Sequence, residues 1–242
     1  MRRADAAAGR ARMKALILAA GRGERMRPLT DTTPKPLLVV RGKRLIEWHI
    51  ESLVAQGITD IVINTAWLGE EFPVALGTGA RYGARISYSM EGQRYGGALE
   101  TAGGMATALP LLGDAPFALA NGDVFAPGFR FDAQIVERFM ADDNLLAHLV
   151  MVPNPPQHAN GDFGISAQGL LLNDAASRYT YSGLALYRPE IVRNIAAGER
   201  APLLPLLRLG AALGRISASL YSGEWHDVGT PQRLDALNRA SH

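Results

Sequence analysis

The 242-residue sequence contains no cysteine. This absence excludes disulfide bonds, thiolate metal sites and a cysteine nucleophile together. It also lacks an apolar run of the length that a membrane-spanning helix needs, about 20 residues. The most apolar stretch, 202–213, is interrupted by Pro205, Arg208 and Gly210. We therefore expect a soluble, cytoplasmic protein without a membrane partner.

A strong excess of charge is lacking as well, because 25 basic and 23 acidic residues give a net charge of +2. Residues 1–12 carry four arginines and Asp5, which leaves the rest of the chain close to neutral. Such a chain offers no broad basic face, and we expect no nucleic-acid partner. Residues 1–12 lack the apolar segment of a secretory signal and are predicted to be a disordered extension before Met13.

What the chain does contain is a regular alternation of short apolar runs and helical patterns. Continuous apolar runs of this length are typical of strands buried on both faces of a parallel sheet. They cover 14–20, 60–64, 85–90, 117–121 and 145–152, and the helical patterns cover 44–57 and about 100–109, 132–141, 189–197 and 231–239. The alternation predicts an α/β fold with a mostly parallel central sheet flanked by helices. Residues 13–242 would form one domain, in which 153–190, rich in turn residues, is a small mixed-sheet insertion.

A glycine-bearing loop follows the first predicted strand, in the segment LAAGRGERMRP at 18–28. The dinucleotide fingerprint G-x-G-x-x-G is incomplete there, because Met26 occupies the position of the third glycine. A Walker A loop is excluded elsewhere, since Gly42 and Lys43 are followed by Arg44. The loop is therefore of neither of these two kinds.

Backbone N–H groups at Gly21 and Gly23, with Arg25 and Arg27 close behind, suit a polyphosphate. N–H dipoles and guanidinium groups both favour dense negative charge. A plain turn with solvated arginines is equally compatible with this spacing. Lys35 lies between two prolines, which stiffen the backbone and make the lysine a positioned charge; a solvated lysine in a proline turn is the alternative.

Two aspartates are candidate ligands for a metal ion. Asp123 follows the buried run 117–121, and ligands collect beyond the carboxyl ends of strands in open parallel sheets. Asp227 lies in the segment EWHDVGTP. Two carboxylates, phosphate oxygens and water would form the all-oxygen site that Mg²⁺ prefers. Taken singly, each aspartate is equally compatible with a turn or a helix N-cap.

Taken together, these motifs resemble the sugar-1-phosphate nucleotidyltransferases, whose signature is L-A-A-G-x-G-x-R followed by P-K-P. Here the segment reads LAAGRGERMRPLTDTTPKPLL, and the likeness covers nearly the whole chain after Met13, through NGD (121–123), GDFG (161–164), YSG (181–183) and WHDVGTP (225–231). The resemblance implies a Rossmann-like, GT-A type fold with a sugar-binding subregion at about 153–190. The chain is most similar to the compact uridylyltransferases of cell-wall recycling, which implies UTP and a sugar 1-phosphate, N-acetylmuramate 1-phosphate, as substrates.

The resemblance also implies a role for each site residue. Nucleotide binding would involve Gly21, Gly23, Glu24, Arg25, Lys35, Thr101 and Gly103. The sugar would be contacted by Asn121, Asp162, Ser182 and Gly183, and Mg²⁺ would be held by Asp123 and Asp227. Arg25, Lys35 and Asp123 would be the catalytic residues.

The sequence departs from the family pattern in two places. Many relatives carry a Glu-Lys-Pro run whose lysine grips the sugar phosphate, but the corresponding region here, 173–183, offers Arg178 instead. The loop 93–99 beside the expected base site is also longer than the family pattern suggests. Glucose-1-phosphate thymidylyltransferase and mannose-1-phosphate guanylyltransferase activities therefore stay open. A non-catalytic nucleotide sensor and a nicotinamide dehydrogenase are the alternatives of another class, the latter disfavoured by Met26.

Overall fold

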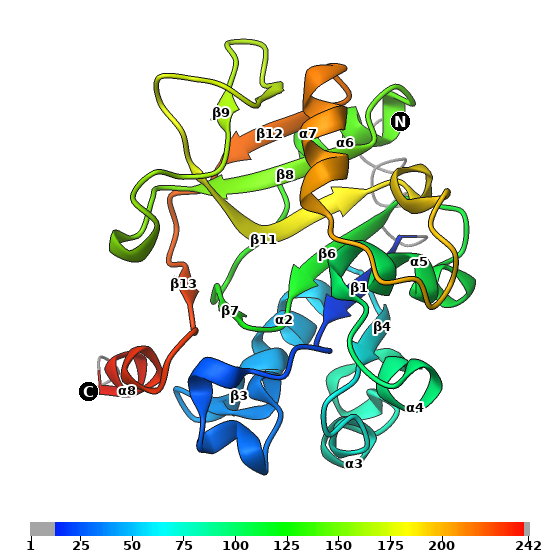
Figure 1. The fold of residues 1–242 in the computed structure, drawn as a ribbon, viewed down its shortest axis with the longest axis vertical. Helices are drawn as coiled ribbons and strands as arrows, with labels where there is room; N and C mark the ends of the chain where they lie inside the picture. The colour runs from blue at the N-terminus through cyan, green and yellow to red at the C-terminus, as the bar shows by residue number, and fades with distance from the viewer. Residues whose placement is uncertain (1–12, 240–242) are drawn as a thin grey trace.

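A seven-stranded sheet forms the centre of the computed structural model, which describes residues 13–239 (Figure 1). Its strands are β1 (Lys14–Leu18), β4 (Asp60–Thr65), β5 (Arg85–Met90), β6 (Phe117–Asn121), β8 (Ala147–Val152), β11 (Thr180–Tyr187) and β12 (Ile216–Leu220). The order across the sheet is β12-β8-β11-β6-β1-β4-β5. β11 is antiparallel to both its neighbours, whereas the other neighbouring strands pair in parallel. The predicted mostly parallel sheet is confirmed.

The strands bury both of their faces. In β1, Ala15 and Ile17 point into one core cluster, and Leu16 points into the other. β6 divides in the same way, with Ala118 on one side and Leu119 on the other. Successive side chains of a strand point to opposite faces. A sheet with two covered faces therefore needs apolar residues at every position, which is why the apolar runs in the sequence are continuous.

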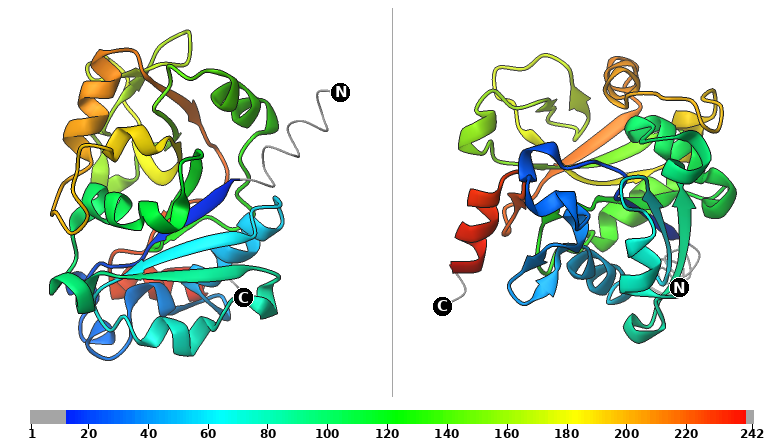
Figure 2. Two further views of the ribbon diagram at one scale, coloured as in Figure 1. Left: turned by 90° about the vertical axis from the view of Figure 1, so that its right-hand side faces the viewer. Right: turned by 60° about the horizontal axis from the view of Figure 1, so that its bottom comes forward.

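Helices cover each face of the sheet (Figure 2). One core cluster receives side chains from α2 (Leu45–Val54), α3 (Glu71–Leu76) and α6 (Ala133–Ala141). The other receives them from α5 (Glu100–Leu112), α7 (Leu204–Ala212) and the 3₁₀ helix η6 (Pro189–Val192). The remaining helices are α4 (Glu91–Tyr95), α8 (Pro231–Arg239) and the 3₁₀ turns η1 (Glu24–Met26), η2 (Leu29–Asp31), η3 (Lys35–Leu37), η4 (Ala80–Tyr82) and η5 (Pro156–His158). Within residues 13–239, no helix combines the length and the apolar character that crossing a bilayer requires.

Three short antiparallel ribbons complete the fold. They are β2 (Val39–Val40) with β3 (Lys43–Arg44), β7 (Val124–Phe125) with β13 (His226–Asp227), and β9 (Gly164–Ile165) with β10 (Leu171–Leu172). Of the segment 153–190, only β9 and β10 form a separate hairpin, while β11 is an inner strand of the central sheet. The extension predicted at 1–12 lies outside the described residues.

One predicted helix is wrong. The pattern at 189–197 forms only the short η6, because the chain turns back toward α5. Glu199 accepts a hydrogen bond from the backbone N–H of Ala196 at 3.1 Å, so that group does not continue a helix. The carbonyl of Ala201 then accepts the N–H groups of Ala102 and Gly103 in the first turn of α5, each at 3.1 Å. The segment caps α5 instead of extending η6.

Candidate active site

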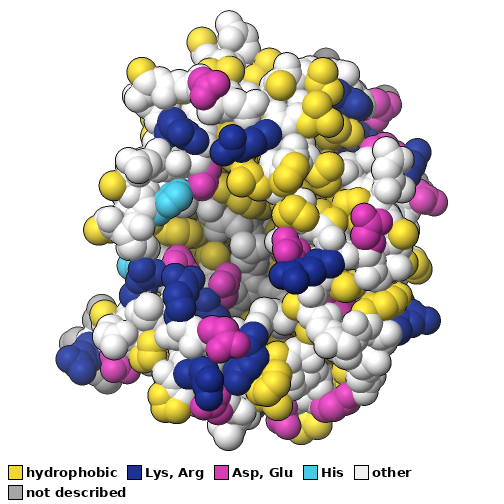
Figure 3. Space-filling view, viewed as in Figure 1, with side chains coloured by type: hydrophobic (Ala, Val, Ile, Leu, Met, Phe, Trp, Pro, Cys, Tyr) yellow, Lys and Arg dark blue, Asp and Glu magenta, His cyan; other side chains and the backbone are white. Residues whose placement is uncertain are grey.

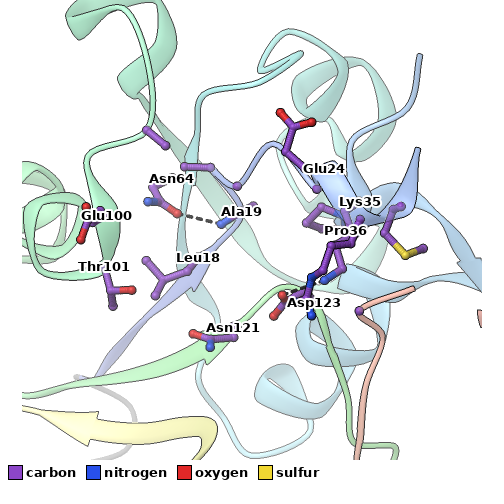
Figure 4. Close-up of a pocket in the computed structure, with 17 residues that line it drawn as sticks. Leu18, Ala19, Glu24, Lys35, Pro36, Asn64, Glu100, Thr101, Asn121 and Asp123 are labelled. Carbon is purple, nitrogen blue, oxygen red and sulfur yellow. Dashed lines mark hydrogen bonds and ion pairs between the residues drawn. The ribbon is translucent and has the colours of Figure 1, made fainter. Parts of the chain in front are cut away.

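A cavity of about 380 Å³ opens at the carboxyl ends of β1 and β6, next to the carboxyl end of β4. It lies in the hollow on the face shown in Figure 3, where Lys, Arg, Asp and Glu side chains gather around the rim. Its lining includes these residues predicted from the sequence: Gly21, Gly23, Glu24, Arg25, Lys35, Thr101, Asn121 and Asp123. Lys35 and Asp123 lie on one side of the cavity, and Glu100 and Thr101 lie across from them (Figure 4). The topology therefore gathers residues from four separate motifs in one place.

The glycine loop is held rigidly by Arg22. Its guanidinium carbon lies 3.7 Å from the centre of the Trp67 ring, Nη1 donates to the carbonyl of Thr30 at 2.8 Å, and Nη2 donates to Asp31 at 3.0 Å. Gly23 adopts a φ of +70°, and a Cβ there would lie 3.0 Å from the Thr30 methyl group. Because the left-handed backbone and the close approach both favour glycine, the tight turn depends on this residue.

Arg25 is placed quite differently from Arg22. It is exposed, it lines the cavity, and it forms no hydrogen bond or ion pair with any residue of 13–239. The next residue, Met26, is 1% exposed and is part of a third core cluster, made of Met26, Val40, Leu45, Phe125, Val228, Leu234 and Leu237. Met26 thus stands where the dinucleotide fingerprint has its third glycine, and its buried apolar side chain anchors the loop to the core. The anchor fixes the backbone while the guanidinium stays available to a ligand.

Lys35 forms an ion pair with Asp123, with 2.9 Å between Nζ and Oδ2. Lys35 begins η3 between Pro34 and Pro36, and the residue is buried. Asp123 lies two residues beyond the end of β6, and its side chain is 42% exposed. The lysine therefore lies in the buried wall of the cavity, while the carboxylate is exposed to the cavity.

His49 contacts the backbone of Val124, the residue after Asp123. It lies on the buried face of α2, and its Nε2 is 2.7 Å from the carbonyl oxygen of Val124. Burial lowers the pKa of His49, so the ring is neutral at neutral pH and Nε2 must carry the proton that it donates to the carbonyl. The sequence analysis did not identify His49, although its place on the apolar stripe of Ile46, Ile50 and Leu53 is a signal of burial.

The second aspartate lies on the neighbouring strand. β13 pairs with β7 so that Asp227 faces Val124, and Val228 donates to the carbonyl of Asp123 at 3.1 Å. Gly229 lines the cavity, and a Cβ on it would lie 3.0 and 3.1 Å from the two carboxylate oxygens of Asp227. No group of three or more His, Cys, Asp or Glu side chains that could hold a metal ion exists within 13–239. The two aspartates, 104 positions apart in the sequence, thus lie near each other through β7 and β13, but Asp227 is not among the residues that line this cavity, and its Oδ2 is paired with Arg233 at 2.6 Å. Their carboxylate oxygens are of the kind that Mg²⁺ prefers.

A buried polar chain joins the two sides of the cavity. Asn64 accepts the N–H of Ala19 at 2.8 Å and donates to Glu91 at 2.6 Å, and Glu91 accepts the N–H of Leu99 at 3.0 Å. Burial raises the pKa of Glu91, which is fully enclosed. This chain fixes Leu99 against the end of β1, and the predicted loop 93–99 begins inside α4, which covers 93–95. Neither Asn64 nor Glu91 belongs to one of the motifs in the sequence, so no signal there marked them.

Gly103, predicted near the base, does not line the cavity. A Cβ on Gly103 would lie 2.2 Å from the carbonyl oxygen of Glu199 and 3.1 Å from the nitrogen of Ala201. Its hydrogen lets α5 pack closely against the 199–201 segment. Thr101, two residues earlier, does line the cavity.

The residues predicted to contact the sugar occupy two different places. Asn121 lines the cavity, and Gly183, at a φ of +79°, packs so tightly that a Cβ would lie 2.6 Å from the Asn121 amide nitrogen. Ser182 is buried and donates to the carbonyl of Val150 at 2.7 Å. Asp162 accepts the N–H of Tyr181 at 2.8 Å and lies 2.9 Å from His158. Ser182 and Asp162 are therefore not among the lining residues of this cavity.

A mostly parallel sheet with a glycine loop and an exposed arginine at its carboxyl edge defines an α/β protein whose candidate site has the groups that suit a phosphorylated ligand. The chain belongs to the nucleotidyl transferase family, whose model matches residues 14–242. It is 49% identical over 224 residues to N-acetylmuramate alpha-1-phosphate uridylyltransferase of Neisseria meningitidis serogroup B, covering 92% of this chain and 95% of that one. The enzyme of the same name from Caulobacter vibrioides is 34% identical over 227 residues, covering 90% and 92%.

A solved structure shows the same fold. It is that of a Bacillus anthracis protein described as a glucose-1-phosphate thymidylyltransferase, in complex with a sucrose. The TM-score is 0.80 at 22% sequence identity, and the match covers 95% of each chain. At this low identity the likeness concerns the fold alone.

Proposed function

We propose that this protein transfers the uridylyl group of UTP to N-acetylmuramate 1-phosphate, which yields UDP-N-acetylmuramate and pyrophosphate for the recycling of cell-wall sugar in the cytoplasm. The observation that carries the proposal is the Lys35–Asp123 ion pair in the cavity beside the glycine loop, with Asp227 on the adjoining strand β13. The choice of UTP and of this sugar is supported by the 49% identity with the relative from Neisseria over nearly the full length of both chains.

The triphosphate would lie over the glycine loop. Backbone N–H groups of 21–24 and the unpaired guanidinium of Arg25 can bind the two terminal phosphates, which leave as pyrophosphate. Lys35 would offset the negative charge that gathers on the α-phosphate during transfer. Thr101 would contact the base across the cavity, with Gly103 shaping the helix from which it projects.

Asp123 and Asp227 would hold Mg²⁺, which would supply positive charge that offsets part of the negative charge of the phosphates. His49 contacts the backbone carbonyl of Val124, and the pairing of β7 with β13 places Asp227 opposite Val124. These two contacts would fix the backbone next to both carboxylates. Asn121 would contact the sugar, and the Gly183 turn holds its amide in place. Asp162 and Ser182 would support the sugar side through the backbone of 178–184, since their side chains are committed to Tyr181 and Val150.

The reaction needs no protein nucleophile. An oxygen of the sugar phosphate, already an anion at neutral pH, attacks the α-phosphorus of UTP in line. A new P–O bond forms to the sugar phosphate, and the bond between the α-phosphorus and its bridging oxygen breaks as pyrophosphate leaves. The side chains of this site then act by alignment and by charge stabilisation, as in other phosphoryl transfers.

The test is a matrix of triphosphates and sugar 1-phosphates given to the purified protein with Mg²⁺. We expect pyrophosphate release to be fastest with UTP and N-acetylmuramate 1-phosphate, and mass spectrometry to identify UDP-N-acetylmuramate. Preference for dTTP with glucose 1-phosphate, or for GTP with mannose 1-phosphate, would replace the proposal by one of those activities. Binding of UTP without turnover of any pair would point to a nucleotide sensor.

A further inference from the structure

Arg178 does not line the cavity that holds Lys35 and Asp123. One of its guanidinium nitrogens donates to the backbone carbonyl of Asp162, and its buried Nε has no hydrogen-bond partner within 13–239. Arg178 lines a different cavity, together with Asn154 and Tyr179. The cation that would hold the sugar phosphate must therefore come from elsewhere in the fold.

We propose that Arg233, in the first turn of α8, binds the phosphate of the sugar 1-phosphate. This assignment rests on the proposed function only in requiring a sugar 1-phosphate as the second substrate. Nη1 of Arg233 lies 2.6 Å from Oδ2 of Asp227, and both side chains are 29% exposed. Its guanidinium is therefore beside one of the two carboxylates at the edge of the cavity.

The remaining donors of this guanidinium are free. Nη1 also approaches the carbonyl of Asp227, at 3.5 Å, but Nε and Nη2 have no hydrogen-bond partner within the described 13–239. An arginine fork presents parallel donors that match two phosphate oxygens. Arg233 can thus keep its contact with Asp227 and still offer donors to a phosphate.

Arg233 also occupies the right position. A Cβ on Gly229, which lines the first cavity, would lie 2.9 Å from Nη1 of Arg233. Arg233 and Asp227 line a second cavity of about 470 Å³ as well, together with Trp225, Pro155 and others. The guanidinium therefore stands between the cavity assigned to the nucleotide and a space that can take a monosaccharide. Leu234, the next residue, is buried in the third core cluster and holds the helix turn in place.

Two of the neighbouring cations, Arg41 and Lys35, already have ion-pair partners. Arg41, which lines the second cavity, donates to both carboxylate oxygens of Glu224, at 3.0 and 2.5 Å, and lies over the Phe125 ring at 4.9 Å. Lys35 is paired with Asp123. By contrast, Arg233 is the cation beside Asp227. Its neighbour Leu234 packs in the third core cluster, which also contains Met26, the neighbour of Arg25.

The experiment compares Arg233→Gln and Arg233→Lys with a control, Arg239→Gln, which changes an exposed arginine of the same helix. The substrate is whichever sugar 1-phosphate the unmodified protein converts. For Arg233→Gln we expect the KM of the sugar 1-phosphate to rise about 10- to 100-fold, the range for a charge-assisted hydrogen bond, and the KM of UTP to stay within about twofold. Arg233→Lys should lie between, since an ammonium keeps the charge without the fork, and Arg239→Gln should match the unmodified protein.

A second readout does not depend on turnover. Calorimetric titration of N-acetylmuramate 1-phosphate, with Mg²⁺ and a non-hydrolysable UTP analogue present, should show binding weakened by the same factor in Arg233→Gln, while binding of the analogue itself is unchanged. Equal losses for both substrates, or an unchanged KM and binding of the sugar phosphate, would overturn the role of Arg233 and leave the proposed function standing. Failure of the unmodified protein to bind or convert any sugar 1-phosphate would overturn both.

Discussion

Nζ of Lys35 lies 2.9 Å from Oδ2 of Asp123, and the two partners are unequally exposed, at 9% for the lysine side chain and 42% for the aspartate. A buried ammonium is costly without a partner, so the aspartate stabilises the lysine in the free protein. Two prolines hold the lysine backbone, and the end of β6 holds the aspartate. The ion pair is therefore already formed in the free protein, and its carboxylate is exposed to the cavity.

Lys35→Ala and Asp123→Ala should each lower kcat about 10²- to 10³-fold, the usual cost of losing one preorganised charged group in a site. Steady-state pyrophosphate release measures this, and circular dichroism checks that each variant is folded. Lys43→Ala is the matched control, because Lys43 pairs with Glu51 on the surface, away from the cavity. Near-normal turnover by either site variant would remove that residue from the mechanism.

Replacement by alanine should lower stability at Arg22 and activity at Arg25. Arg22 stacks on Trp67 and donates to Thr30 and Asp31, so Arg22→Ala should reduce the free energy of unfolding by about 1 to 3 kcal/mol. Arg25 has no partner within the described residues, so Arg25→Ala should leave stability within about 0.5 kcal/mol but lower kcat/KM for UTP strongly. Urea unfolding and initial rates separate the two effects, and a destabilised Arg25→Ala would show that Arg25 contributes to the fold as well as to the site.

Gly183→Ala should damage the site through Asn121. The new Cβ would meet the Asn121 amide at 2.6 Å, and the backbone φ of +79° adds strain. We expect a loss of stability of about 1 to 3 kcal/mol together with a raised KM for the sugar 1-phosphate. Gly128→Ala is the control, since Gly128 has a φ of +72° but nothing within 4 Å of a Cβ. If both variants behave alike, strain alone would explain the effect and the contact with Asn121 would be irrelevant.

His148 should make the protein less stable in acid. Burial lowers the pKa of His148 from 6.5 to about 4, and its ring contacts the hydroxyls of Ser217 and Ser219, each at 2.9 Å. As pH falls, the unfolded chain takes up the proton first, so the stabilisation is present above about pH 6.5 and is lost toward pH 4. We expect the free energy of unfolding to fall by about 2 kcal/mol between about pH 7 and pH 5 from this group.

Urea titrations at several pH values test that expectation. His148→Gln, which can still contact both serines, should remove this part of the pH dependence, whatever its stability at neutral pH. An unchanged slope in the variant would mean that another group causes the acid sensitivity.

The sequence by itself determined the fold class and predicted the edge of the sheet at which the candidate site lies. The apolar runs at 14–20, 60–64 and 117–121 are long enough, and apolar enough, that only a sheet buried on both faces satisfies them. The loop glycines and the prolines around Lys35 act on their own backbone, so their effects are local and can be inferred from neighbouring residues. Parallel strands then place whatever follows them at one edge, which is why Asn121 and Asp123 could be expected there.

Only the tertiary structure decided which side chains are free to act. Whether Arg25, Arg178 or Arg233 can bind a phosphate depends on partners far away in the sequence or on another element, and spacing carries no information on those partners. The same holds for the burial of Ser182, for the polar chain through Asn64 and Glu91, and for the failure of 189–197 to form a full helix. Each of these results from competition among hydrogen bonds that exists only after the chain has closed on itself.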